Sequence, residues 1–179
     1  MHMYKGVVVH KRYGKLNLGI LYANGWVYGI AVAHNSTSRL LNRLRRLVNF
    51  AAMRGVFIKI SSDRVMEKQA LEILDKVYDV VTGKRTNREL FSYLDPSHLN
   101  INERRVYLAL LQTKRGQTIT YGDLARMTRI NSPRLIGQIL SRNPFPVIIP
   151  CHRVIGERSL QGYLGSEYEA KKLLLARER

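Results

Sequence analysis

Apolar residues and turn signals alternate along the first third of the chain. The β-prone runs 7–10, 16–22 and 26–33 are separated by Gly14 and by the pair Asn24-Gly25. An Asn-Gly pair between two apolar runs is typical of a tight β-hairpin. The pattern therefore predicts a small antiparallel sheet at the N-terminus, with Trp26 in the core.

Two segments with helical periodicity follow the predicted strands. Residues 39–54 and 66–81 both repeat apolar side chains on one face, and Ser36 can cap the first of these helices. A short strand, 56–60, lies between them. Strands covered by helices indicate a mixed α/β (α+β) fold for a domain of residues 1–92.

A polar stretch, residues 84–99, predicts a linker to a second domain of residues 100–179. Asn100, with Glu103 three residues later, forms a variant of the capping box and predicts a helix that Gly116 ends. The second domain is therefore expected to begin with a helix.

The next segment resembles a helix-turn-helix. A short helix at 121–127 and a turn precede Ser132 and Pro133, which are favoured at the N-cap and first position of a helix. On that second helix, small and polar residues share the face opposite the apolar stripe: Arg134, Gly137, Gln138 and Ser141. The pattern indicates a mostly helical, winged-helix-like DNA-binding domain, although ordinary amphipathic helix pairs share it.

The charge of the chain favours nucleic acid. Thirty Lys and Arg against 13 Asp and Glu give a net charge of +17 in 179 residues, and both halves carry the excess. A polyanionic partner is expected, with DNA ahead of an anionic membrane. No apolar run approaches the roughly 20 residues that span a bilayer, and no secretory h-region is visible, so a cytoplasmic or nucleoid protein is expected.

One helix carries its own basic face. The arginines on segment 39–54 are Arg39, Arg43, Arg45 and Arg46. We interpret this face as solvated, in preference to a DNA-facing or protein-facing patch.

Cys151 is the only cysteine, so neither an internal disulfide nor a multi-cysteine zinc site can form. It follows a strand-like apolar run, 145–149, and precedes His152 and Arg153. A lone cysteine beside an apolar run is most often inert, but a nearby His or Arg favours the nucleophilic thiolate. Neighbouring residues in extended chain point to opposite faces, so a Cys–His relay needs a water or a bend. The spacing leaves both interpretations open.

The motif Pro150-Cys151-His152-Arg153-Val154 resembles the active-site motif of the O6-alkylguanine-DNA alkyltransferases, the methylated-DNA–protein-cysteine methyltransferases. Further segments resemble this family in order and spacing between about residues 101 and 178. These are residues 120–125, 133–137, 142–144, 162–165 and 174–178. The first domain resembles the family only in its size and in its strands followed by helices.

The resemblance implies a single-turnover DNA repair enzyme, a methylated-DNA–[protein]-cysteine S-methyltransferase. It would bind double-stranded DNA through the minor groove, flip O6-alkylguanine such as O6-methylguanine out of the duplex, and transfer the alkyl group irreversibly to Cys151. No metal or cofactor takes part in the bond-making, and no zinc site is expected in the first domain. A monomer without membrane contact is expected.

The resemblance also assigns roles to residues. Glu178 would polarise His152, which acts on Cys151 through a water, while Tyr121 would donate to the base and Asn143 would brace the loop. The implied DNA-binding residues are Thr120, Pro133, Arg134, Gly137, Gln138, Ser141 and Arg142. The implied base-pocket residues are Tyr121, Arg153, Val154, Leu164 and Gly165. The chain departs from the family pattern at Pro133, Gln138 and Leu164.

Three other functions compete with repair. A binding-only alkyltransferase-like protein would recognise the lesion, but such proteins lack the cysteine. A cysteine hydrolase would turn over repeatedly and would leave the charge of +17 unexplained. A transcription regulator would present base-reading side chains to the major groove, whereas the predicted recognition helix presents a slim face.

Overall fold

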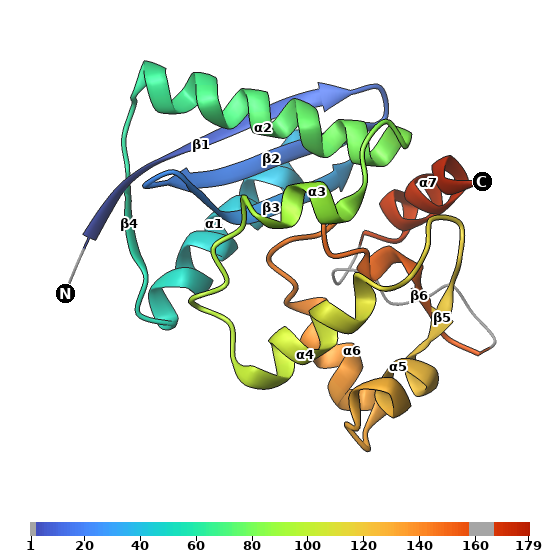
Figure 1. Ribbon diagram of the computed structural model, residues 1–179. Coiled ribbons are helices and arrows are strands. Elements are labelled where there is room, and N and C mark those ends of the chain that lie inside the picture. The colour runs from blue at the N-terminus through green and yellow to red at the C-terminus, as the bar shows by residue number, and fades with distance from the viewer. Residues whose placement is uncertain (1–2, 158–166) are drawn as a thin grey trace.

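The computed structural model describes residues 3–157 and 167–179, and its N-terminal half is built on a four-stranded sheet (Figure 1). Strands β1 (Met3–Tyr13), β2 (Leu16–Ala23) and β3 (Trp26–His34) form the predicted antiparallel meander, and β4 (Phe57–Ile60) pairs with β1 in parallel. The strand order is β3-β2-β1-β4. Asn24 and Gly25 both have positive φ, of 49° and 81°, as the predicted two-residue hairpin requires.

Helices cover both faces of this sheet. Helix α1 (Thr37–Met53) packs on β2 and β3, and helix α2 (Arg64–Thr82) packs on β1 and β2 from the other side. Every residue of β2 is consequently buried. Residues 27–33 of β3 are also buried, but Trp26 lies at the start of the strand beside the Asn24-Gly25 turn and is 43% exposed, so its prediction as a core residue is wrong.

The polar segment 84–99 contains a helix that sequence analysis missed. Helix α3 (Asn87–Phe91) has a capping box between Thr86 and Glu89, so its polar residues serve a helix end. Leu90 and Leu94 are buried in the same apolar cluster as the inner face of α2 and the helices that follow. The core is therefore continuous across this segment.

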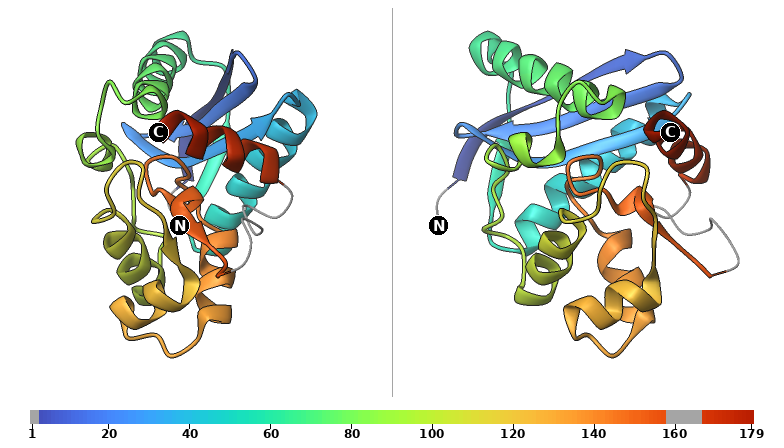
Figure 2. Two further views of the ribbon diagram at one scale, coloured as in Figure 1. Left: turned by 90° about the vertical axis from the view of Figure 1, so that its right-hand side faces the viewer. Right: turned by 45° about the vertical axis from the view of Figure 1, so that its right-hand side comes forward.

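The C-terminal half consists of short helices and one small parallel sheet. It contains α4 (Ile101–Leu110), β5 (Ile119–Thr120), α5 (Tyr121–Thr128), α6 (Pro133–Ser141), the 3-10 turn η1 (Cys151–Arg153), β6 (Val154–Ile155) and α7 (Tyr168–Glu178). Ser132 caps α6 and Pro133 is its first residue, as predicted. Helix α7 packs on α2, β3 and η1, which brings the end of the chain back to the sheet (Figure 2).

Helix α4 ends earlier than predicted, at Leu110 rather than near Gly116. The hydroxyl of Thr113 donates to the Leu110 carbonyl at 2.6 Å and so takes the place of a further helical N–H. The carbonyl of Thr113 itself accepts a hydrogen bond from Arg153 at 2.7 Å. The chain therefore leaves the helix to meet a residue 40 positions later.

The run 145–149 is an irregular loop rather than the predicted strand. Prolines at 144, 146 and 150 remove the N–H donors that a strand ladder needs, and Val147 has a φ of 76°, which turns the chain. Asn87 of α3 donates to the carbonyls of Val147 and Ile148 at 2.6 and 3.1 Å. Helix α3 thus holds the loop that leads to the cysteine.

Candidate active site

The Cys151 thiol lies at the start of η1 and is 3% exposed. Its backbone N–H donates to the carbonyl of Ile149 at 2.7 Å, and Nδ2 of Asn143 lies 3.0 Å from Sγ. Asn143 also donates to Ile149 and accepts from the N–H of Phe145, so it fixes both ends of the loop. Residues 151–153 form a helical turn rather than extended chain. The side chains of Cys151 and His152 are therefore not forced onto opposite faces, as they would be in a strand.

Burial raises the pKa of Cys151, because a low-dielectric surrounding disfavours the thiolate. The hydrogen bond from Asn143 and the charges of Arg43 and Lys171 act in the opposite direction. The resting thiol is therefore protonated, but two cations and one N–H donor favour the thiolate once a base removes the proton.

His152 can be that base. Burial lowers its pKa and outweighs the raising effect of Glu178, so its imidazole is neutral near pH 7. Its Nε2 lies 2.8 Å from Oε1 of Glu178. Since a carboxylate only accepts, this contact assigns the proton of the neutral ring to Nε2 and leaves Nδ1 as an acceptor.

Glu178 is the centre of a buried ionic network. Burial alone would raise its pKa, but hydrogen bonds from His152 and Arg153 lower it to about 2. Arg153 donates to both carboxylate oxygens, at distances of 2.9 to 3.1 Å. The backbone N–H of Gly116 donates to Oε2 at 3.1 Å. The carboxylate is thus ionised throughout the neutral range.

The guanidinium of Arg153 is fully engaged in this network. Besides Glu178, it donates to the carbonyl and hydroxyl of Thr113 and to Oδ1 of Asn87. Sequence analysis placed Arg153 in a base pocket, whereas these contacts make it a clamp between α3, the segment after α4, and α7. Thr113 and Asn87 carry no motif, and nothing in the sequence pointed to them.

Lys171 is a polar residue of this site that sequence analysis missed. Its side chain is completely buried, and Nζ donates to the carbonyl of Val154 at 2.7 Å. Burial lowers its pKa to about 8, while Cys151 acts in the opposite direction. A signal was present, because Lys171 lies seven residues, or two helical turns, before Glu178 and shares its face of α7.

Tyr121 reaches the site through a strand pairing. In the sheet formed by β5 and β6, Thr120 pairs with Ile155, so Tyr121 begins α5 beside the segment that follows η1. Burial raises the pKa of the Tyr121 hydroxyl, and the Cys151 thiolate raises it further, so the hydroxyl keeps its proton and can donate. A Cβ placed on Gly137 would meet the Tyr121 ring at 3.8 Å, so α6 also passes close to this side chain.

The predicted DNA-binding residues lie at the outside of α5 and α6. Pro133, Arg134, Gln138, Ser141 and Arg142 are exposed, and Gly137 is half-buried. Thr120 differs from these, because its hydroxyl caps α5 by accepting from Asp123 N–H at 3.0 Å. Leu164 and Gly165 of the implied base pocket lie outside the described residues, whereas Val154 is buried after the thiol turn.

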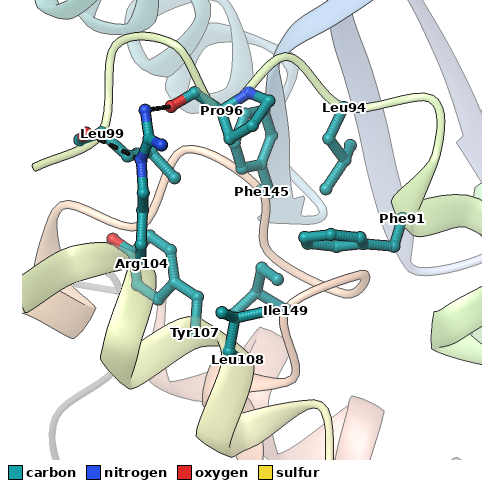
Figure 3. Close-up of a pocket in the computed structure, with 9 residues that line it drawn as sticks. All are labelled: Phe91, Leu94, Pro96, Leu99, Arg104, Tyr107, Leu108, Phe145 and Ile149. Carbon is teal, nitrogen blue, oxygen red and sulfur yellow. Dashed lines mark hydrogen bonds between the residues drawn. The ribbon is translucent and has the colours of Figure 1, made fainter. Parts of the chain in front are cut away.

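An apolar cavity of about 210 Å³ lies behind the loop that carries the thiol (Figure 3). Its walls include Phe145 and Ile149 of this loop and Tyr107 of α4, and the guanidinium of Arg104 donates to the carbonyls of Pro96 and Leu99 at its edge. Cys151 does not line it, so this cavity is separate from the thiol site.

Neither a metal cluster nor a membrane span is found within residues 3–157 and 167–179. No group of three His, Cys, Asp or Glu side chains there could hold a metal ion. No helix in the same ranges is long and apolar enough to cross a membrane.

Known proteins show the same arrangement of sequence and fold. Residues 102–179 match the family "6-O-methylguanine DNA methyltransferase, DNA binding domain". The chain is 35% identical over 153 residues to the methylated-DNA–protein-cysteine methyltransferase of Thermococcus sibiricus, which covers 85% of this chain and 83% of the relative.

Two solved structures extend the comparison to the fold. The O6-methylguanine-DNA methyltransferase of Pyrococcus kodakaraensis superimposes with a TM-score of 0.81 at 32% identity, over 97% of this chain and 98% of that one. The Mycobacterium tuberculosis OGT in complex with DNA has a TM-score of 0.54 at 18% identity, over 96% and 92% of the two chains, and shares the fold.

Proposed function

Because the chain belongs to the methylated-DNA–protein-cysteine methyltransferase family, we propose that it repairs DNA by moving the alkyl group of O6-alkylguanine onto its own Cys151. The observation that carries this proposal is the buried thiol, which has a hydrogen-bond donor, two cations and a neutral histidine around it. We infer the substrate class from the name that the relatives carry. A buried thiol with a neighbouring base is suited to accept an alkyl group.

The transfer is an in-line displacement at the alkyl carbon. Nδ1 of His152 takes the thiol proton through a water, and Glu178 stabilises the resulting imidazolium. The thiolate sulfur then bonds to the alkyl carbon as the bond from carbon to the guanine oxygen breaks. Tyr121 donates a hydrogen bond to the departing base, where negative charge develops. The proton that His152 took from the thiol finally passes to the guanine anion, and the imidazole is neutral again. The products are restored guanine and an S-alkylcysteine, so each chain acts once.

A duplex substrate requires the base to leave the stack. The exposed face of α6 fits the minor groove because its central position is a glycine and only Arg134, Gln138 and Ser141 project from it. Residues 101–153 hold nine Lys and Arg against two Asp and Glu, so phosphate contacts can dominate the affinity. We expect a monomer that acts on chromosomal DNA in the cytoplasm or nucleoid.

Counting transferred methyl groups tests this function. Incubated with excess duplex containing radiolabelled O6-methylguanine, the protein is expected to acquire one methyl group per chain and then stop. Zero transfer with retained lesion binding would identify a binding-only protein, and repeated turnover would identify a hydrolase. Either result contradicts the proposal.

Arg134 is expected to fill the gap that the extruded base leaves. It lies exposed in the first turn of α6, so its side chain can enter the stack when α6 enters the minor groove. Flipping costs a few kcal/mol, and we expect Arg134→Ala to slow transfer from duplex by about 10- to 100-fold at saturating protein. Transfer from the free O6-alkylguanine base, which needs no flipping, should be unchanged.

The matched control for this variant is Arg126→Ala, which removes an exposed arginine of α5 that pairs with Asp123. Single-turnover rates on both substrates are measured for both variants. Equal slowing of Arg134→Ala on duplex and free base would show a distorted pocket. It would refute the proposal that Arg134 fills the gap left by the extruded base.

A further inference from the structure

A second cavity, of about 350 Å³, lies between helix α1 of the N-terminal half and the end of α6. It is lined by Arg43, Arg46, Leu47, Phe50, Ser141, Arg142 and Asn143. Asn143 connects it to the thiol, since its Nδ2 lies 3.0 Å from Sγ of Cys151. A group bound in this cavity would therefore lie one side chain away from the reacting sulfur.

Three arginines line this cavity, and two of them, Arg46 and Arg142, have no ionic partner among the described residues. Helix α1 contains no acidic residue. The arginines near its two ends are paired, Arg39 with Glu167 and Arg54 with Glu103. Among the described residues, no carboxylate lies within 4.0 Å of a nitrogen of Arg46 or Arg142. Arg46 and Arg142 thus present cationic groups to an anion from outside the protein.

The length of α6 relates this cavity to the DNA backbone. From Arg134 to Arg142 the helix advances about 12 Å, at 1.5 Å per residue. The minor groove is only about 6 Å wide. If Arg134 lies in the groove and α6 runs across it, the end of α6 reaches the groove wall, which is made of sugar and phosphate.

We propose that Arg43 and Arg46 of α1, together with Arg142, bind a phosphodiester of the DNA strand that carries the alkylated guanine. This inference rests on the proposed function and gives the N-terminal half a part in DNA binding. It revises the interpretation of the α1 basic face as merely solvated, but only for the two arginines that border the cavity. Guanidinium groups match a phosphate because each can donate two parallel hydrogen bonds to it.

The apolar wall formed by Leu47 and Phe50 adds to this arrangement. It excludes water from one side of the cavity and so strengthens the attraction between guanidinium and phosphate. It also offers a surface on which a deoxyribose can pack. An isolated inorganic anion would use only the arginines.

The first test compares Arg43→Gln, Arg46→Gln and the double variant with Arg45→Gln. Arg45 is exposed on the same helix but does not line the cavity, so it controls for the loss of one charge. We expect each cavity variant to weaken binding to undamaged duplex by about tenfold, as a lost hydrogen bond to a charged group does. The slope of log K against log salt should become shallower by about 0.9 per lost contact, and Arg45→Gln should change neither quantity appreciably.

The second test identifies the phosphate. A series of duplexes carries one neutral methylphosphonate at successive positions around the lesion. At one of these positions, the substitution should weaken binding of the wild-type protein and have a clearly smaller effect on the double variant, in which only Arg142 still contacts the phosphate. Independent losses at every position would overturn the proposal.

The remaining outcomes separate this proposal from the proposed function. Unchanged duplex affinity in Arg46→Gln, with methyl transfer intact, would show that the basic face of α1 is solvated or protein-facing. The proposed repair function would not be affected. Equal slowing of Arg43→Gln on duplex and free base, at unchanged duplex affinity, would show that Arg43 acts on the thiol alone, and would overturn its proposed binding to a phosphate. Failure of the wild-type protein to methylate itself from duplex and from the free base would instead contradict the repair function, and duplex affinities would still be measurable.

Discussion

Replacing Cys151 by alanine is expected to abolish methyl transfer completely, from duplex and from free base alike. The chain contains no second thiol that could accept the group. Neither His152 nor Lys171 can replace it, since the imidazole acts as a base and the buried Nζ of Lys171 is held by the carbonyl of Val154. The measurement is the radiolabel retained on the chain after single-turnover incubation with O6-methylguanine duplex.

The variant should remain folded and should still bind DNA. Removing one buried sulfur leaves a small cavity that costs about 1 kcal/mol, and the backbone contacts of η1 do not involve the side chain. Duplex affinity at low salt is the control, because the arginines and α6 are unchanged. Label found on Cys151→Ala would eliminate this residue as the acceptor. Loss of both label and duplex affinity would show that the variant is unfolded, and the test would then be made with Cys151→Ser.

Glu178→Gln is expected to have the second largest effect, and it should act on both rate and stability. The amide keeps the shape of the carboxylate but loses the charge that faces His152 and Arg153. Transfer from free base should slow by about 10²- to 10⁴-fold, the range for a lost general base, because the imidazolium is no longer stabilised. The free energy of unfolding should fall by about 3 kcal/mol, since the buried guanidinium of Arg153 loses its counter-charge.

The pH dependence of stability gives a further readout of the same variant. The pKa of Glu178 is about 2 in the folded protein and ordinarily 4.5, so the folded state favours the ionised form. This contribution is complete above pH 4.5 and is lost as the pH falls from 4.5 towards 2. Denaturant unfolding across this window should show a steeper loss for the wild type than for Glu178→Gln.

The matched control is Glu169→Gln on the same helix. Glu169 is exposed and pairs with Lys172 at the surface, so its loss should change stability by less than about 1 kcal/mol and leave the rate unchanged. A Glu178→Gln rate within about twofold of the wild type would contradict the role given to the carboxylate.

Local patterns determined much of the N-terminal half and the helix-turn-helix. The Asn24-Gly25 hairpin, the apolar stripes of α1 and α2, and the start of α6 at Ser132-Pro133 are all features that residues close in sequence specify. Each depends on φ preference, capping or periodicity, which act within a few residues. The segment containing Cys151 was singled out in the same way, by a motif of five consecutive residues.

Contacts between distant residues decided the geometry of the site. Helix α4 stops at Leu110, where Thr113 turns back to meet Arg153, and the loop at 145–149, which its prolines make irregular, is held in place by Asn87. The buried Lys171 interrupts the apolar stripe of α7, and the carbonyl of Val154, which is distant in sequence, accepts a hydrogen bond from it.

The sequence by itself determined the elements of the sheet, the helix pair and the identity of the sulfur with its motif. The resemblance already implied that Glu178 acts on His152. Only the tertiary structure decided that the same carboxylate neutralises Arg153, and that Arg43 of the N-terminal half lies near the thiol. The physical reason is that electrostatic and hydrogen-bond partners are chosen by proximity in space, and burial, which sets their strength, is a property of the assembled core.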